Sequence, residues 1–81
     1  MKIQVQLFAA ARDAAGQSPV IVELSAAASV ADLRRQLVID FPKLDSIAKI
    51  LLVAVNQQYA GDDDVLSEGD SVACFPPVSG G

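Results

Sequence analysis

The longest amphipathic helix that this sequence predicts runs from Ser29 to Phe41, and it limits the chain to folds in which one helix covers one face of a sheet. Its apolar side chains recur at helical spacing and form one stripe: Val30, Leu33, Leu37, Val38 and Phe41. Ser29 is suited to cap the first turn, with Asp32 at the capping-box position, and Pro42 stops the helix. The charged residues expected to point away from the stripe are Arg34, Arg35 and Asp40.

The segments before this helix predict a hairpin of two strands. Lys2 to Phe8 alternates strictly, so its aliphatic side chains share one face while Phe8 falls on the other, mostly polar face. Residues 9–15 are rich in alanine and predict a short helix that Gly16 closes. Val20 to Leu24 then predicts the second strand.

Three further strands are predicted after the helix. Ile50 to Val55 is an unbroken apolar run, which favours a strand with both faces covered. Residues 56–58 predict a turn, and Tyr59-Ala60 a short return strand. Ser71 to Phe75 predicts the last strand, after a turn in which Gly69 is able to take a positive φ.

The predicted order is strand, strand, helix, strand, short strand, strand. This order predicts an α+β fold of the ubiquitin-like β-grasp type, a mixed sheet of about five strands with the first and last strands parallel at its centre. We expect a β-grasp domain over residues 1–75 and a flexible, extended C-terminal tail over residues 76–81. A chain of 81 residues has room for this one domain.

Composition excludes several classes of function. The chain has no histidine and one cysteine, so it lacks the residues for a disulfide, for the usual zinc sites and for a Ser-His-Asp or Cys-His catalytic unit. A net charge of −4 argues against nucleic acid or an anionic membrane as partner and favours a basic protein surface. No apolar stretch reaches membrane-spanning length and the N-terminus does not resemble a signal peptide, so we expect a cytoplasmic protein. We also expect residues 62–64 to be a solvated acidic run and Cys74 to be a small buried apolar residue.

The segment Pro76-Pro77-Val78-Ser79-Gly80-Gly81 is the most informative part of the sequence. Six extended residues reach about 20 Å beyond the last strand. The two prolines favour an extended stem, which lowers the entropy lost when a tail enters another protein. Gly80 and Gly81 have no Cβ, so they can pass through a channel too narrow for side chains, and they leave the terminal carboxylate unshielded to attack a nucleotide phosphate.

Two phenylalanines are expected at the root of this tail. If Val72 and Cys74 face the helix, Phe75 points to the opposite face of the sheet, where Phe8 also lies. Parallel central strands would bring both rings to the same end of the sheet, and alternate residues of Leu51 to Val55 would extend the surface. Such a patch would suit protein docking, although the sequence leaves open whether one or both rings fold back into the core.

Three segments resemble the molybdopterin synthase small subunits, the MoaD family of ubiquitin-like sulfur carriers. They are Leu7 to Gly16 (LFAAARDAAG), Val55 to Gln57 (VNQ) and Leu66 to Gly81 (LSEGDSVACFPPVSGG). The final FPPVSGG is the specific part, and the resemblance extends over the whole chain. Cys74 stands where many members of that family carry a second phenylalanine.

The resemblance implies that this chain is a non-catalytic subunit whose chemistry occurs at its last residue. A ubiquitin-activating-like adenylyltransferase (MoeB-like) uses ATP to adenylate the Gly81 carboxylate, and a sulfur donor protein then converts it to a thiocarboxylate. A MoaE-like large subunit, in a heterotetramer, takes up the tail and passes the sulfur to cyclic pyranopterin monophosphate. The chain itself is expected to bind no cofactor and no metal. The residues expected to act with Gly81 or to contact partners are Gly80, Phe8, Arg12, Phe75, Pro76, Pro77, Val78 and Ser79, with a purely solvated role left open for Arg12.

Three alternatives remain at this stage. The chain could carry sulfur for thiamin thiazole synthesis, with the same tail chemistry. It could be a protein modifier that is conjugated to other proteins through Gly81. It could also be an interaction domain with an inert tail.

Overall fold

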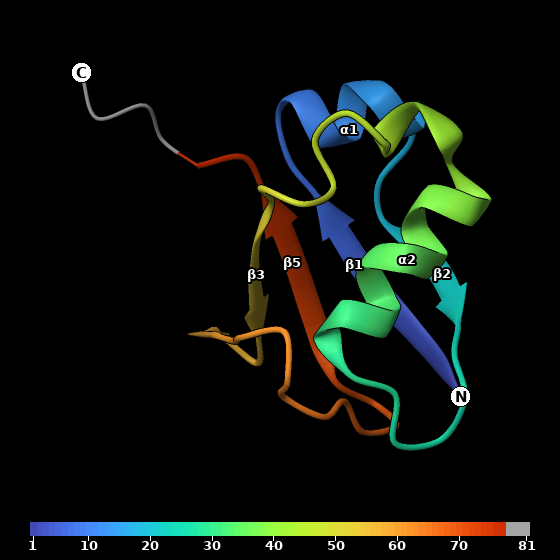
Figure 1. Cartoon of the computed structure of the whole chain (residues 1–81), viewed down its shortest axis with the longest axis vertical. Coiled ribbons are helices and arrows are strands. Elements are labelled where there is room, and N and C mark those ends of the chain that lie inside the picture. Colours follow the sequence, from blue (N-terminus) through green and yellow to red (C-terminus); the bar gives the residue numbers. More distant parts are fainter. Residues whose placement is uncertain (78–81) are drawn as a thin grey trace.

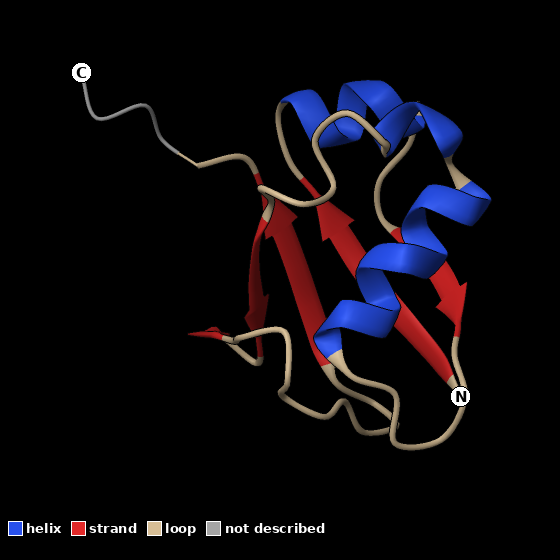
Figure 2. Ribbon diagram, viewed as in Figure 1, coloured by secondary structure: helices blue, strands red, loops and turns tan. Residues whose placement is uncertain are grey.

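The structure is a computed structural model that describes residues 1–77, in which one long helix lies across one face of a five-stranded sheet (Figure 1). The elements in chain order are β1 (Lys2–Leu7), α1 (Ala10–Ala15), β2 (Val20–Glu23), α2 (Val30–Asp40), the short 3₁₀ helix η1 (Pro42–Leu44), β3 (Leu52–Val55), β4 (Gln58–Tyr59) and β5 (Ser71–Phe75). The strand order is β2-β1-β5-β3-β4, and the helices lie on one side of the sheet (Figure 2). Within residues 1–77, no helix has the length and apolar character needed to cross a membrane.

The first and last strands are parallel neighbours in the middle of the sheet. Their register pairs Val5 with Val72 and Leu7 with Cys74, so both strands end at the same edge of the molecule. β2 is antiparallel to β1, and β3 is antiparallel to β5. This topology confirms the predicted ubiquitin-like β-grasp fold and the predicted hairpin of the first two strands.

The predicted cap of α2 is confirmed in detail. The Ser29 hydroxyl accepts a hydrogen bond from the Asp32 backbone N–H, and the Asp32 carboxylate accepts one from the Ser29 N–H. The second bond is the main reason that the pKa of the Asp32 carboxyl is lowered, because it favours the ionised form. The helix ends at Asp40, before Pro42. The capping box therefore begins α2 at the residue that the sequence predicts.

One face of the sheet and one side of α2 form the core. Val30, Leu33 and Leu37 of α2 are buried, as their spacing predicts. The alternating residues of the first strand and of the last strand meet them from the sheet: Ile3, Val5, Leu7, Val72 and Cys74. The opposite face of the sheet has no helix of residues 1–77 over it and remains open (Figure 1).

The expectation that both faces of the Ile50–Val55 strand are covered is wrong. β3 begins only at Leu52, and Val53 alone in it is fully buried. Leu52 and Ala54 lie on the open face and are half-buried, while Ile50 is exposed before the strand begins. An apolar run indicates burial but not on which sides, and one helix can cover only one face of this sheet.

Arg34, expected to point away from the apolar stripe, is less exposed than a charged residue on the outer side of a helix would be. Its side chain is only 17% exposed and hydrogen-bonds to two segments outside the helix, at Ala48 and Asp62. Arg34 follows Leu33 directly and so lies at the border of the apolar stripe, where a long side chain can reach across neighbouring segments. The neighbouring Arg35 is exposed, as predicted.

A two-residue turn joins β3 to β4. Val55 pairs with Gln58, and the two turn residues Asn56 and Gln57 have φ angles of 52° and 71°. Two positive φ angles in a two-residue hairpin loop define a type I′ turn, in which glycine is strongly preferred at the second position. Gln57 therefore occupies a position that suits glycine better.

We expect Gln57→Gly to stabilise the protein by about 0.5 kcal/mol, because relief of the left-handed strain outweighs the added flexibility of the unfolded chain. The measurement is the free energy of unfolding in urea. Gln58→Gly, one residue later in β4, is the matched control and should lower stability, since its backbone is extended. Equal losses in both variants would contradict the assignment of strain to Gln57.

Candidate functional site

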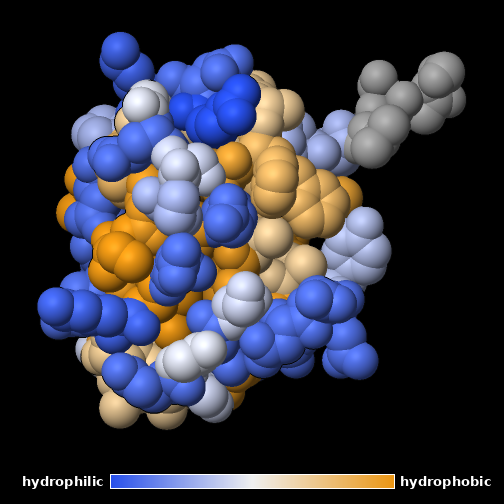
Figure 3. All heavy atoms as spheres, turned by 180° about the vertical axis from the view of Figure 1, so that it is seen from behind, coloured by the Kyte–Doolittle hydropathy of each residue, from blue (hydrophilic) through white to orange (hydrophobic). Residues whose placement is uncertain are grey.

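Three aromatic rings from three strands or their ends form a cluster on the open face, which we call the aromatic patch: Phe8, Tyr59 and Phe75. The ring centroids of Phe8 and Phe75 are 6.4 Å apart in an edge-on arrangement, and those of Tyr59 and Phe75 are 5.9 Å apart. Phe8 is 48% exposed and Tyr59 is 74% exposed. Seen from behind, this face carries a concentration of hydrophobic side chains close to where the chain leaves the domain (Figure 3). Exposed apolar patches of this kind are typical of protein docking surfaces, which makes this one a candidate site.

The sheet register brings the rings together. Leu7 pairs with Cys74, and the Phe8 N–H donates to the Cys74 carbonyl at 3.1 Å, which sets Phe8 beside Phe75. On the other side, Leu52 pairs with Phe75. The prediction that Phe8 and Phe75 share the open face is confirmed, and the face of β3 that extends it carries Leu52 and Ala54.

The other predicted partner residues are placed less completely. Pro76 is half-buried and Pro77 is exposed, directly after β5. Arg12 is exposed on α1 and forms no ion pair with residues 1–77. The remaining predicted residues lie outside the described part of the chain: Val78, Ser79, Gly80 and Gly81.

Tyr59 is a member of the patch that the sequence analysis missed. The prediction of a turn over residues 56–58 gave no register for the return strand. With a turn of only two residues, Tyr59 pairs with Ala54 and shares its face of the sheet. The VNQ segment itself holds the signal, because asparagine is favoured at the first position of such a turn.

Cys74 is fully buried, which confirms the prediction that it is a small apolar residue of the core. Burial raises the pKa of its thiol to about 11 from an ordinary 9.0, and the positive charge of Arg34 opposes this shift only in part. A thiol that remains protonated at neutral pH is a poor nucleophile. The structure therefore offers no role for Cys74 as a sulfur relay.

The raised pKa of Cys74 predicts a pH dependence of stability. The folded state holds the thiol proton more tightly than the unfolded state. The free energy of unfolding is therefore highest below about pH 9 and falls by about 2 kcal/mol as the pH rises toward 11. Urea unfolding on both sides of this range measures the loss. Cys74→Ala has no thiol to ionise and should lose less stability over the same range; parallel losses in both proteins would contradict the prediction.

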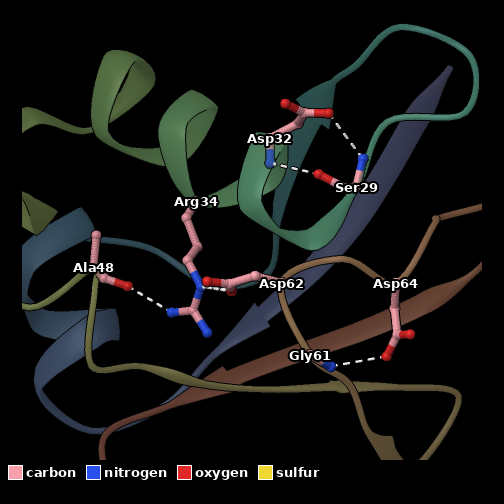
Figure 4. Close-up of polar contacts among 7 residues, drawn as sticks. All are labelled: Ser29, Asp32, Arg34, Ala48, Gly61, Asp62 and Asp64. Atoms are coloured by element: carbon pink, nitrogen blue, oxygen red, sulfur yellow. Dashed lines mark hydrogen bonds and ion pairs between the residues drawn. The ribbon is translucent and has the colours of Figure 1, made fainter.

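The acidic run is less free than the sequence predicts. Asp62 pairs with Arg34, and the Asp64 carboxylate accepts the Gly61 N–H at 2.8 Å (Figure 4). Among residues 1–77, no group of three or more His, Cys, Asp or Glu side chains is placed to hold a metal ion.

A β-grasp domain with one main helix across its sheet, an open sheet face and aromatic rings at the root of its C-terminal segment has the architecture of a ubiquitin-like protein. The ThiS family model matches residues 5–81. The chain belongs to the ThiS family, among the MoaD-like small subunits of molybdopterin synthase.

Three comparisons describe its relatives. The chain is 41% identical to the molybdopterin synthase sulfur carrier subunit of Chlamydomonas reinhardtii, over 100% of both chains. The crystal structure of SAMP1 from Haloferax volcanii is 31% identical, with a TM-score of 0.87 and 100% of both chains covered. A chain in the complex of subunits 1 and 2 of the molybdopterin-converting factor from Helicobacter pylori shares the fold, with a TM-score of 0.69 over 100% of both chains at 20% identity.

Proposed function

We propose that this protein is the sulfur carrier subunit of a molybdopterin synthase and docks through its aromatic patch on a large synthase subunit. The observation that carries this proposal is the position of the patch: Phe8 and Phe75 meet at the end of β5, from which Pro76 and Pro77 lead toward Gly80 and Gly81. A carrier needs a docking surface next to its C-terminal segment, because binding of the partner at that surface also directs the segment toward the partner's active site. The sulfur carrier name of a relative that is 41% identical supports the same role.

The chemistry would take place at the Gly81 carboxylate. A partner enzyme attaches AMP to this carboxylate and releases pyrophosphate from ATP, because a free carboxylate is a poor acceptor for sulfur. A sulfur donor then displaces AMP and leaves a thiocarboxylate. In the large subunit the thiocarboxylate passes its sulfur to cyclic pyranopterin monophosphate, and Gly81 becomes a carboxylate again. Acid, base and nucleotide sites belong to the partners in this scheme.

The domain supplies binding energy and position. Exposed aromatic rings that become buried in an interface are the side chains that most often dominate affinity. The net charge of −4 favours a partner with a basic surface around its apolar contact. Two prolines after β5 restrict the stem, so less entropy is lost when the tail is taken up.

Intact-mass spectrometry tests the proposed function. We expect incubation with the activating enzyme, ATP and a sulfur source to replace one oxygen of the full chain by sulfur. The product should then yield molybdopterin when the large subunit and cyclic pyranopterin monophosphate are added. Capture of a thiazole synthase in place of a large synthase subunit would instead assign the carrier to thiamin synthesis.

A second function, as a protein modifier, is favoured by one observation. SAMP1 from Haloferax volcanii, a small archaeal modifier protein by name, has nearly the same fold and is 31% identical. Conjugation would join Gly81 to lysine side chains of other proteins and produce covalent adducts of higher mass on denaturing gels. A carrier alone produces only the free chain and its thiocarboxylate.

A further inference from the structure

Arg34 has a half-buried side chain whose guanidinium lies between two segments that are far apart in sequence. Its Nε donates to Asp62 Oδ1 at 2.8 Å, and its Nη1 donates to the Ala48 carbonyl at 2.7 Å (Figure 4). Charge-assisted hydrogen bonds of this kind are stronger than those between neutral groups. These hydrogen bonds offset the free-energy cost of partly removing the guanidinium from water, a cost that a fully solvated arginine avoids.

The two acceptors lie on either side of the β3–β4 hairpin. Ala48 precedes β3, and Asp62 follows β4. The hairpin lies at the edge of the sheet, where β5 is its one neighbour among the strands of residues 1–77. Arg34 therefore ties both ends of an edge hairpin to α2, the most regular helix of the domain.

This hairpin carries part of the docking surface. Tyr59, on the two-residue β4, is the most exposed member of the aromatic patch, and Leu52 and Ala54 lie beside it on β3. Two backbone hydrogen bonds add to the connection after β4, since the N–H groups at the start of α2 donate to the Asp62 and Asp64 carbonyls at 3.0 and 2.9 Å. The segment that follows Tyr59 directly is thus anchored against α2.

We propose that Arg34 is a positioning residue for the docking surface: by bracing both ends of the β3–β4 hairpin against α2, it holds Tyr59 in register with Phe75 for the partner. Arginine suits this role because its planar fork donates in two directions at once, whereas a lysine ammonium on a flexible stem acts as a point charge. The part of this inference that concerns partner affinity rests on the proposed function. The bracing itself does not.

Three variants and one control test the bracing. Arg34→Gln removes both charged contacts, Arg34→Lys keeps the charge without the fork, and Asp62→Asn weakens one contact from the exposed side. Arg35→Gln is the matched control, because Arg35 is the next residue, is 68% exposed and pairs with Asp32 of its own helix. Asp62→Asn also serves if Arg34→Gln fails to fold.

Amide hydrogen exchange reports the bracing without any partner. The Ala60 N–H donates to Val53 across the hairpin at 2.9 Å, and the Leu24 N–H donates to Met1 near the opposite edge at 2.8 Å. We expect Arg34→Gln to speed exchange at Ala60 about tenfold while Leu24 changes by less than about twofold. Arg34→Lys and Asp62→Asn should lie between this variant and the wild type, and Arg35→Gln should match the wild type. The nuclear Overhauser contacts between the Tyr59 and Phe75 rings should weaken in the same order.

Calorimetry with the large synthase subunit then tests the consequence. We expect the Kd to rise about tenfold for Arg34→Gln, with Arg34→Lys partly restoring affinity and Arg35→Gln leaving it unchanged. Equal acceleration at Ala60 and Leu24 would overturn the proposal, since it would show only a global loss of stability. Faster exchange at Ala60 with an unchanged Kd would overturn the positioning role. If the wild type itself did not bind the large subunit, the proposed function would fail, and the bracing would still be decided by exchange.

Discussion

A chain that lacks Gly81 is expected to accept no sulfur and to support no molybdopterin formation. Each residue contributes about 3.5 Å to an extended tail, so the terminal carboxyl of the shortened chain would stop short of both partner active sites by that distance. Misplacement of a reacting group by about 1 Å can already cost about a hundredfold in rate. One alanine added after Gly81 should have the same effect, because it moves the carboxylate and introduces a Cβ.

The measurements for the Gly81 variants are intact mass after incubation with the activating enzyme and molybdopterin yield with the large subunit. Gly61→Ala is a suitable control, because a Cβ at Gly61 meets no atom within 4 Å. That variant should retain full sulfur loading. Urea unfolding should give the same stability for the shortened chain and the wild type. Thiocarboxylate on a chain without Gly81 would refute the proposed chemistry.

The second large effect is expected at Phe75, the ring that touches both other members of the aromatic patch. Replacement by alanine should weaken binding of the large subunit by about 2–4 kcal/mol, the range of a dominant aromatic contact at an interface. Stability should change far less, by about 1 kcal/mol, because Phe75 is only half-buried and lies outside the core cluster. Sulfur loading of this variant at Gly81 should be reduced less than its binding to the large subunit.

Calorimetric titration of the large subunit, beside urea unfolding, separates binding from stability in Phe75→Ala. Ile21→Ala is the matched control: Ile21 is a large apolar residue, 58% exposed, on β2 at the edge of the sheet away from the patch. It should bind the large subunit like the wild type. Equal weakening by both variants would show that a general apolar face, and not the aromatic patch, binds the partner.

Local sequence determined most of the elements of this protein. The stripe of α2, its Ser29–Asp32 cap and the final strand from Ser71 to Phe75 all follow from the spacing of a few neighbouring residues. The place of Phe8 and Phe75 on one face also followed, because alternation along each strand and a parallel central pair leave both rings opposite the helix. The prediction that sulfur is carried at Gly81 likewise came from the order of the last six residues.

Contacts between residues far apart in the sequence depended on how the elements pack. Tyr59 joined the aromatic patch through the register of a two-residue turn, and Arg34 found its partner Asp62 at a distance of 28 positions along the chain. Leu52 and Ala54 of β3 lie on the open face of the sheet, because α2 covers the opposite face. Periodicity reports whether a residue faces an apolar or a polar environment, but the identity of its neighbour depends on strand register and on how segments pack across the sheet. For that reason the sequence predicted most of the elements, while the complete aromatic patch and the contacts of Arg34 could be identified only from the fold.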